Sequence, residues 1–332
     1  MNDPQRNRHS FFWPIILIGV GIIWLLVNLG MIAPINFVTL LQFWPILLII
    51  LGLDILLGHR YPWAGSLVAL LALGGLIAYL VMQPNTGKPV SYASGSKEET
   101  LSEPLEDASS VSYYFETASE PVKIDSLDEG SNLLLNADLV HQGTINFNVS
   151  GTTNKMVNLS ETTNPNDWFG WNLSDINNKW DISLARKLPT DLRIDGGSGA
   201  LTVDLENVQL ESLSADLGSG ASSFILPEGD DTVSVDINSG SGAVNMQVPE
   251  DTDVTIRIES GSGALNIDVP NDAAVMVEVM DSGSGSLQIG NSIDQVTGDN
   301  ETGTWKTSGY DSAKRHILIK LLDRGSGAIS IE

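Results

Sequence analysis

Gly-Ser-Gly-Ala-Leu-Thr-Val-Asp-Leu, residues 197–205, contains the pattern that decides the fold of this chain. Its Gly-Ser-Gly element recurs at 218, 240, 261, 283 and 325, at spacings of 21, 22, 21, 22 and 42 residues. A fixed period of this length predicts structural units that stack on one another. The glycines expected to form the corners between strands are Gly197, Gly199, Gly218, Gly220, Gly240, Gly242, Gly261, Gly263, Gly283, Gly285, Gly325 and Gly327.

Each unit shows the same internal order of residues. A small residue follows the glycines, and apolar positions then alternate with polar ones, as in Leu201, Val203 and Leu205. Alternation at every second residue is typical of a β-strand with one buried face. Many units turn at a proline and return through a second alternating segment; these prolines are Pro227, Pro249 and Pro270. The sequence therefore predicts an all-β, solenoid-like domain made of two-strand units of 21–22 residues.

The glycines have a structural explanation. A sharp corner between strands requires a positive φ or a close approach of two backbones, and glycine permits both. A phosphate-binding loop is the alternative interpretation, but neither the helical pattern nor the lysine that such a loop requires follows Gly-Ser-Gly here. The nine-residue repeat of a calcium β-roll is also missing. We therefore interpret the glycines as structural corners.

The double spacing before Gly325 indicates an insertion. Residues 290–315 are polar and are expected to form a loop, after which the alternating pattern resumes at Ile317. The chain ends on an alternating segment, residues 328–332, which we expect to close or cap the stack.

Composition divides the chain into two parts near Gln83. The whole chain has 41 acidic and 17 basic residues, a net charge of −24, and yet a positive mean hydropathy of +0.07. Residues 1–83 carry three arginines and two aspartates, whereas residues 84–332 carry a net charge of −25. Such an acidic surface disfavours nucleic acid as a partner. The complete lack of cysteine excludes disulfides, thiolate metal sites and cysteine nucleophiles.

The first part of the chain is expected to lie in the membrane. Three apolar stretches, 11–32, 35–57 and 63–82, are candidate transmembrane helices, and the first is long enough to cross a hydrocarbon core of about 30 Å. A cleaved signal peptide is the competing interpretation of the first stretch. Its length of 22 residues, its lack of a clear cleavage site and the two stretches behind it disfavour that interpretation.

Basic residues predict the orientation. Arg6 and Arg8 precede the first stretch and Arg60 separates the second from the third, which places these segments in the cytoplasm. Three crossings then place the acidic part outside the cell membrane. The predicted organisation is a cytoplasmic N-terminus at 1–10, a transmembrane region at 11–83, a linker at 84–107 and an extracytoplasmic β-repeat domain at 108–332.

The transmembrane region contains an internal duplication. Phe-Trp-Pro at 12–14, with Trp13 and Pro14, is repeated as Phe-Trp-Pro at 43–45, with Trp44 and Pro45. Pro14 is placed to open a helix, whereas Pro45 is expected to kink one. Asp54 is the one carboxylate inside a predicted span, and an acid within the membrane is a candidate functional residue. The alternative is that Asp54 lies near the cytoplasmic end and pairs with Arg60 or lipid headgroups.

Two resemblances follow from these motifs. The repeated Phe-Trp-Pro-Ile-x-Leu-Ile, with a glycine seven residues after each proline, resembles the Lia-type (LiaI/LiaF-like) transmembrane region of bacterial envelope-stress proteins. Some Lia-type proteins use four spans, whereas three are counted here. Residues 108–332 resemble the toastrack, adhesin-like β-repeat domain through the runs at 197–205 and 207–220 and through Trp305, Gly309 and Tyr310.

Catalytic chemistry finds no support in the sequence. His9, His59, His141 and His316 are scattered, and no spacing typical of metal ligands or of a catalytic serine is present. We therefore predict no enzyme activity, no metal site and no cofactor. The densest aromatic cluster of the acidic part consists of Trp168, Phe169, Trp171 and Trp180. It either contacts a ligand such as a cell-wall glycan or the bilayer, or caps the open end of the β-stack.

The resemblances imply a non-enzymatic envelope protein of the cell membrane. The resemblance to Lia-type proteins implies that this chain modulates a membrane partner, such as a sensor histidine kinase, in response to cell-wall or membrane stress. Because the sequence offers little cytoplasmic chain, we expect that contact to be lateral, between helices and among membrane lipid. The alternatives are a surface-displayed adhesin or binding module anchored by the spans, and a scaffold that self-associates through strand edges.

Overall fold

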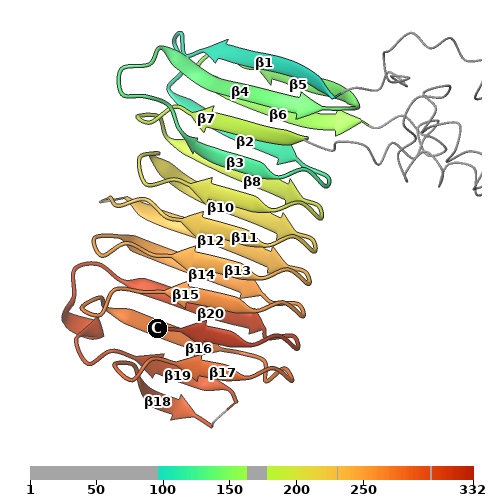
Figure 1. The fold of residues 1–332 in the computed structure, drawn as a ribbon. Coiled ribbons are helices and arrows are strands. Elements are labelled where there is room, and N and C mark those ends of the chain that lie inside the picture. The colour runs from blue at the N-terminus through green and yellow to red at the C-terminus, as the bar shows by residue number, and fades with distance from the viewer. Residues whose placement is uncertain (1–95, 163–177, 230, 300) are drawn as a thin grey trace, which may run out of the picture. The chain divides into compact units, whose positions relative to one another are not determined.

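A computed structural model describes residues 96–162, 178–229, 231–299 and 301–332. The described residues all belong to one of the two compact units into which the chain divides. They form two β-sheets whose strands run side by side along the unit (Figure 1). The described part contains one 3-10 turn, η2 (Tyr310–Ser312), and no α-helix. The predicted all-β class is therefore confirmed for these residues, and the three predicted membrane helices lie outside them.

Within the described residues, the first sheet has ten strands and the second has eleven. The ten-stranded sheet contains, in spatial order, β1 (Lys97–Pro104), β4 (Leu133–His141), β7 (Lys179–Leu184), β3 (Val122–Ser126), β9 (Leu201–Asp204), β11 (Ser222–Ile225), β13 (Val244–Gln247), β15 (Leu265–Asp268), β21 (Ile329–Ile331) and β17 (Leu287–Ile289). The eleven-stranded sheet contains β18 (Asp294–Gly298), β19 (Gly303–Lys306), β16 (Val275–Val279), β20 (Ile317–Asp323), β14 (Asp253–Glu259), β12 (Thr232–Ser239), β10 (Leu210–Leu217), β8 (Thr190–Gly196), β2 (Ser110–Glu116), β6 (Asn154–Thr162) and β5 (Thr144–Ser150).

The middle of the domain is a parallel two-sheet solenoid. Each coil consists of one strand from the eleven-stranded sheet, a Gly-Ser-Gly corner and one strand from the ten-stranded sheet, as in β8–β9 and β10–β11. Residues one repeat apart are in register, so Leu213 pairs with Leu192 on one side and with Val235 on the other. These pairings confirm the two-strand unit predicted from the sequence period.

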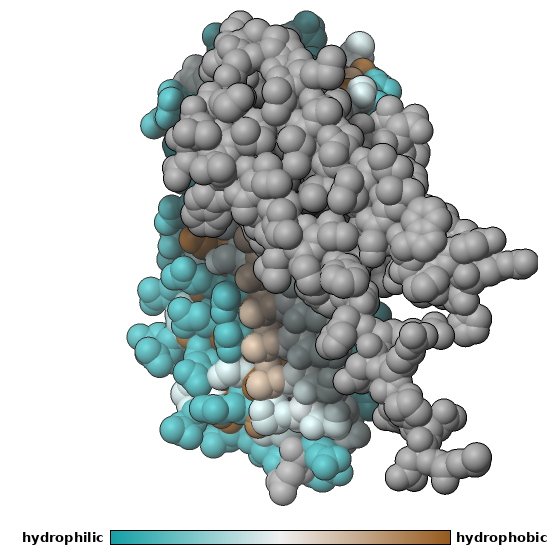
Figure 2. Space-filling model, turned by 45° about the vertical axis from the view of Figure 1, so that its right-hand side comes forward, coloured by the Kyte–Doolittle hydropathy of each residue, from teal (hydrophilic) through white to brown (hydrophobic). Residues whose placement is uncertain are grey.

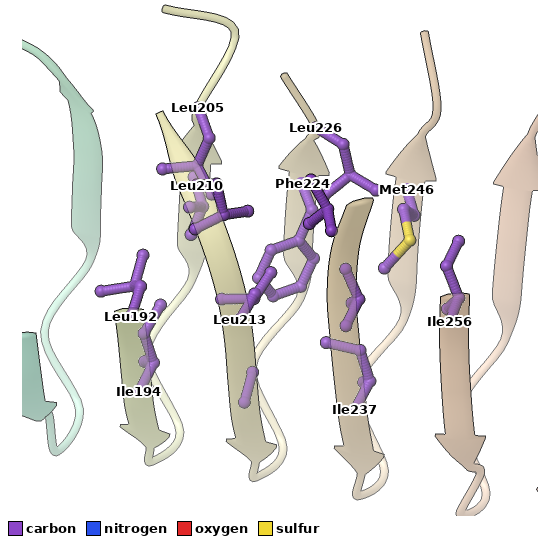
Figure 3. Close-up of a cluster of buried hydrophobic side chains, with 14 of the residues drawn as sticks. Leu192, Ile194, Leu205, Leu210, Leu213, Phe224, Leu226, Ile237, Met246 and Ile256 are labelled. Carbon is purple, nitrogen blue, oxygen red and sulfur yellow. The ribbon is translucent and has the colours of Figure 1, made fainter. Parts of the chain in front are cut away.

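The hydrophobic core lies between the two sheets. Strand β12 alternates between buried and more exposed positions along its length, as do β8 and β14. Figure 3 shows the inward side chains of successive strands in contact, with Phe224 of β11 near Leu213 of β10 and Met246 of β13 beyond them. Burial of this continuous apolar layer is the main favourable term in folding, because the domain has no disulfide to supplement it.

The coils do not stack in chain order at the C-terminal end. Ile319 of β20 pairs with Ile256 of β14 on one side and with Val277 of β16 on the other. In the other sheet β21 lies between β15 and β17 in the same way. The prediction that the last strand caps the stack is therefore wrong: the coil β20–β21 lies inside the stack. The sequence period could not reveal this order. The spacing of 42 residues between Gly283 and Gly325 is the same whether the coil β16–β17 or the coil β20–β21 lies last in the stack.

The N-terminal end shows a matching intercalation. Tyr113 of β2 pairs with Val157 of β6 and with Leu192 of β8, while Ile124 of β3 lies between β7 and β9. The Tyr113 hydroxyl donates a hydrogen bond of 2.6 Å to the Leu134 carbonyl, and burial raises its pKa above the ordinary value for tyrosine. The first coil is thus held between two later ones.

Two segments, the start of the domain and the insertion at 290–315, differ from the sequence-based expectations. Strand β1 falls inside the segment assigned to the linker, and it pairs antiparallel with β4 as an edge strand of the ten-stranded sheet. Charged residues are common both in edge strands and in polar linkers, which is why the sequence placed β1 in the linker. The insertion at 290–315 is more ordered than a loop: β18 and β19 form an antiparallel pair, and β19 pairs with β16.

Candidate interaction sites of the β domain

The Gly-Ser-Gly corners form a column along one side of the stack. A Cβ atom on Gly242 would overlap the carbonyl oxygen of Gly220 in the preceding coil, and one on Gly220 would overlap that of Gly199. Serine N–H groups bridge the coils; Ser262 donates to the Gly240 carbonyl at 3.0 Å. Close backbone approach therefore explains most of these glycines. Positive φ occurs within the repeat corners at Gly283 and Gly325, on either side of the last coil contact.

The first coil has a corner without glycine. Gly197 and Gly199 approach the carbonyls of Ala118 and Glu120, so residues 118–120 occupy the place of a Gly-Ser-Gly. Glu120 is buried, and its carboxylate accepts hydrogen bonds from the N–H groups of Ala118 and Ser119, each at 3.0 Å. The sequence period missed this corner because its residue types differ from those of the repeat.

The corner column is a narrow surface with small side chains. In Figure 2 hydrophilic residues dominate the visible described surface, and a column of paler, weakly hydrophobic residues runs along the stack. Its position agrees with the corners, which this view turns forward. Close-packed backbones leave little room between successive corners of the described coils. The glycines of these corners allow the coils to pack closely against one another.

The aromatic cluster is only partly within the described residues. Trp180 lies on β7 with 0 % of its surface exposed, and it packs in the core between the sheets. Its proposed role in ligand contact is therefore wrong, because inward alternation on β7 points the ring away from solvent. Trp168, Phe169 and Trp171 lie outside the described residues.

The membrane motif also lies outside them. Trp13, Pro14, Trp44, Pro45 and Asp54 all precede residue 96. Within the described ranges, no helix is long and apolar enough to span a membrane. The described residues also contain no group of three or more histidine, aspartate or glutamate side chains arranged to hold a metal ion.

Buried charged side chains serve as internal ties. Lys155 of β6 donates to Glu103 at 2.8 Å, to the Pro104 carbonyl at 2.9 Å and to Glu106 at 3.0 Å, which fastens the end of β1 to the other sheet. Arg324 donates to the Glu301 carbonyl at 2.8 Å and to the Gly285 carbonyl at 2.6 Å. These contacts tie the hairpin β18–β19 to the corner of the coil β16–β17.

The C-terminal end of the stack contains a cavity of about 340 Å³, which we call the end cavity. Its lining residues come from β17, β18, β19 and the turn between β17 and β18: Leu287, Ile289, Gly290, Asn291, Ile293, Asp294, Gln295 and Trp305. Both apolar and polar side chains thus meet there. Sequence reasoning missed this site, because it depends on which coil lies last in space.

Comparison with known families identifies the two parts of the chain. Residues 12–90 match the LiaF transmembrane domain, and residues 95–247 match the N-terminal domain of toast_rack. The chain thus carries, one after the other, a segment that matches each of these two families. Both resemblances seen in the sequence are therefore confirmed. The toast_rack match begins at 95, in agreement with β1 as part of the folded domain. Neither description names an enzyme.

Two solved bacterial structures are similar to part of this chain. A candidate cell-adhesion protein from Clostridium sporogenes is 21% identical, with a TM-score of 0.47, over 71% of this chain and 98% of that one. A candidate adhesin from Bacteroides fragilis is 9% identical, with a TM-score of 0.27, over 71% of this chain and 97% of that one. None of the curated proteins matches this chain.

Proposed function

We propose that this chain is a non-enzymatic, membrane-anchored envelope protein that modulates the response to cell-wall or membrane stress. The observation that carries the proposal is the joining of a LiaF transmembrane domain to a toast_rack domain in one chain. In this proposal the transmembrane region contacts a membrane partner, such as a sensor histidine kinase, through its helices. Small residues such as Gly19, Gly21, Gly74 and Gly75 are the proposed packing positions, and Asp54 is the proposed polar contact.

The fold supports a role as a rigid extracytoplasmic body. One continuous core joins all the coils, and close backbone contacts at the corners oppose movement of one coil against another. A signal from such a domain is best carried by its position or occupancy rather than by a change within it. The proposed orientation, with Arg6, Arg8 and Arg60 in the cytoplasm, places this domain outside.

Deletion and complementation test the proposal. Cells lacking the gene are challenged with a cell-wall antibiotic, and envelope-stress transcription is measured with a reporter. We expect the induced signal to change by about fivefold or more, because regulatory coupling is typically of that size. The full chain should restore it, whereas residues 84–332 on an unrelated three-span anchor should not.

Two results would contradict the proposal. One is an unchanged response in the deletion strain together with no membrane protein crosslinked to the full chain. The other is full restoration by the unrelated anchor, which would place the activity in the exposed domain, as a surface-displayed binding module requires.

A further inference from the structure

The coil at the C-terminal end of the stack is incompletely covered. In the ten-stranded sheet, each complete coil directs a pair of side chains into the core, such as Leu265 and Ile267, which are 0 % and 1 % exposed. The equivalent pair on β17, Leu287 and Ile289, is only partly buried. Both residues line the end cavity. The core therefore ends at β17 with apolar surface still in contact with solvent.

The backbone of β17 has a free edge. β21 is the one described strand that pairs with β17, and this pairing uses the Ser286 carbonyl and the Gly290 N–H group. Successive residues of a strand direct their backbone groups to opposite edges. The N–H and carbonyl groups of Leu287 and Ile289 therefore point away from β21. These four groups form a short template for another strand.

The opposite sheet extends further than β17 does. Beyond β16, the eleven-stranded sheet continues through β19 and β18, and the ten-stranded sheet has no described counterpart to them. Gln295 pairs with the buried Trp305 across β18 and β19, so both side chains lie on the same face, yet Gln295 is exposed. One added strand beside β17 would face this overhang and fill the end cavity.

Acidic groups surround this opening. Asp294 lines the end cavity, the Asp299 carbonyl accepts a hydrogen bond from Gln295, and Glu332 accepts one from Gln288 of β17 at 3.0 Å. Hydrogen bonds from the N–H groups of Thr302 and Glu301 hold the pKa of the Asp299 carboxyl below its ordinary value. Among the described lining residues none is lysine or arginine. Lys306 pairs with Asp294 across β18 and β19, but its ammonium group donates to the Asp311 carboxylate at 2.6 Å. This field favours a cationic occupant and disfavours a second copy of the same acidic edge.

We propose that the free edge of β17 binds an extended, cationic segment of a partner protein, which adds as a strand to the ten-stranded sheet. Main-chain hydrogen bonds to Leu287 and Ile289 supply the docking, as in strand addition generally. Alternate side chains of the segment cover Leu287, Ile289 and Trp305, and its lysines or arginines lie near the acidic groups around the opening. The inference is independent of the signalling role proposed above, because it concerns only the exposed domain.

A labelled peptide tests this site on the full chain in nanodiscs. The probe is a fluorescent peptide of about ten residues in which valine alternates with lysine and threonine, and fluorescence anisotropy measures its binding. Ile289→Pro removes an N–H group that points away from β21, and proline is tolerated at such edge positions. We expect Ile289→Pro and Asp294→Lys each to weaken binding about tenfold. Gln288→Ala on the same strand and Glu250→Lys far from it are the matched controls, and both should bind as the unmodified chain does.

Several results would overturn the proposal. Equal binding by Ile289→Pro and Asp294→Lys, or equal binding of a peptide with glutamate in place of lysine, would show attraction to the acidic surface alone. A dimer that sedimentation detects and that Ile289→Pro abolishes would make a second copy the occupant. If Ile289→Pro loses its near-ultraviolet circular dichroism, hydrogen exchange of the unmodified chain decides. Slower exchange at Leu287 and Ile289 with peptide supports the site, and unchanged exchange contradicts it.

Discussion

Truncation of the chain after Arg315 should abolish the cooperative unfolding of the toast_rack part. It removes β20 and β21, which lie inside both sheets and not at their end. Five aliphatic side chains that are 0–2 % exposed are lost: Ile317, Ile319, Leu321, Ile329 and Ile331. At about 1.5–3 kcal/mol for each buried side chain, the loss is roughly 10 kcal/mol, as large as the total stability of a typical domain. Near-ultraviolet circular dichroism during urea unfolding measures this.

Two point mutations test whether the loss of stability comes from the buried side chains of β20 and not from shortening the chain. Ile319→Ala should lower the free energy of unfolding by about 3 kcal/mol, because the side chain is fully buried between the sheets. Leu318→Ala, one residue away on the more exposed face of β20, should cost under about 1 kcal/mol. A truncated chain that keeps a normal unfolding midpoint would mean that β20–β21 is a dispensable end coil.

Gly242→Ala should lower the free energy of unfolding by about 3 kcal/mol or more. The added methyl group would overlap the carbonyl oxygen of Gly220, which belongs to the backbone and has no flexible side chain that could move aside. Because each corner contacts the next, the two coils must separate to admit it. The cost then includes weakened pairing of β13 with β11.

Gly309→Ala is the matched control for this substitution. Gly309 has φ −89° and ψ −3°, and no atom lies within 4 Å of a Cβ placed there. Alanine fits this conformation, so stability should stay the same or rise by up to about 1 kcal/mol through a smaller entropy of the unfolded chain. Equal losses for the two variants in urea unfolding would show that the corner contacts do not hold the stack together.

Regular local features were readable from the sequence. The 21–22-residue period, the alternation of Val233, Val235 and Ile237 and the turns after them all appear in the structure, because each is set by residues within one unit. The strand β1 was not readable, since an edge strand with one partner has little buried surface and resembles a polar tether.

Spatial order was the main feature that the sequence could not supply. Equal units have equivalent pairing surfaces, so Val254 could accept either Val275 or Ile317 as its neighbour; the structure pairs it with Ile317. The position of Trp180 was missed for a related reason. Its dense polar surroundings in the chain suggested exposure, whereas the alternation of the short strand β7 decides its burial.

The order of the coils also determines the proposed binding edge. Because β20–β21 occupies the place next to β14–β15, the coil β16–β17 is displaced to the end, where Leu287 and Ile289 remain partly uncovered. If β17 lay against β15 and β21 came last, the free edge would belong to β21 and the end cavity would have other walls. The proposed binding edge therefore depends on the position of the coil β20–β21 inside the stack.

Engineered cysteine pairs test that claim most directly, since the chain has no cysteine of its own. Ser262 and Ser326 lie on neighbouring corners, with their hydroxyl oxygens 3.2 Å apart, and Ser284 follows on the next corner, where its N–H group donates to Gly325. A disulfide requires Cα atoms within about 7 Å, a distance that one coil spacing satisfies and two spacings exceed. Under mild oxidation Ser262→Cys with Ser326→Cys should form a disulfide, and Ser262→Cys with Ser284→Cys should not. The reverse result, a disulfide between positions 262 and 284 alone, would contradict the intercalated order.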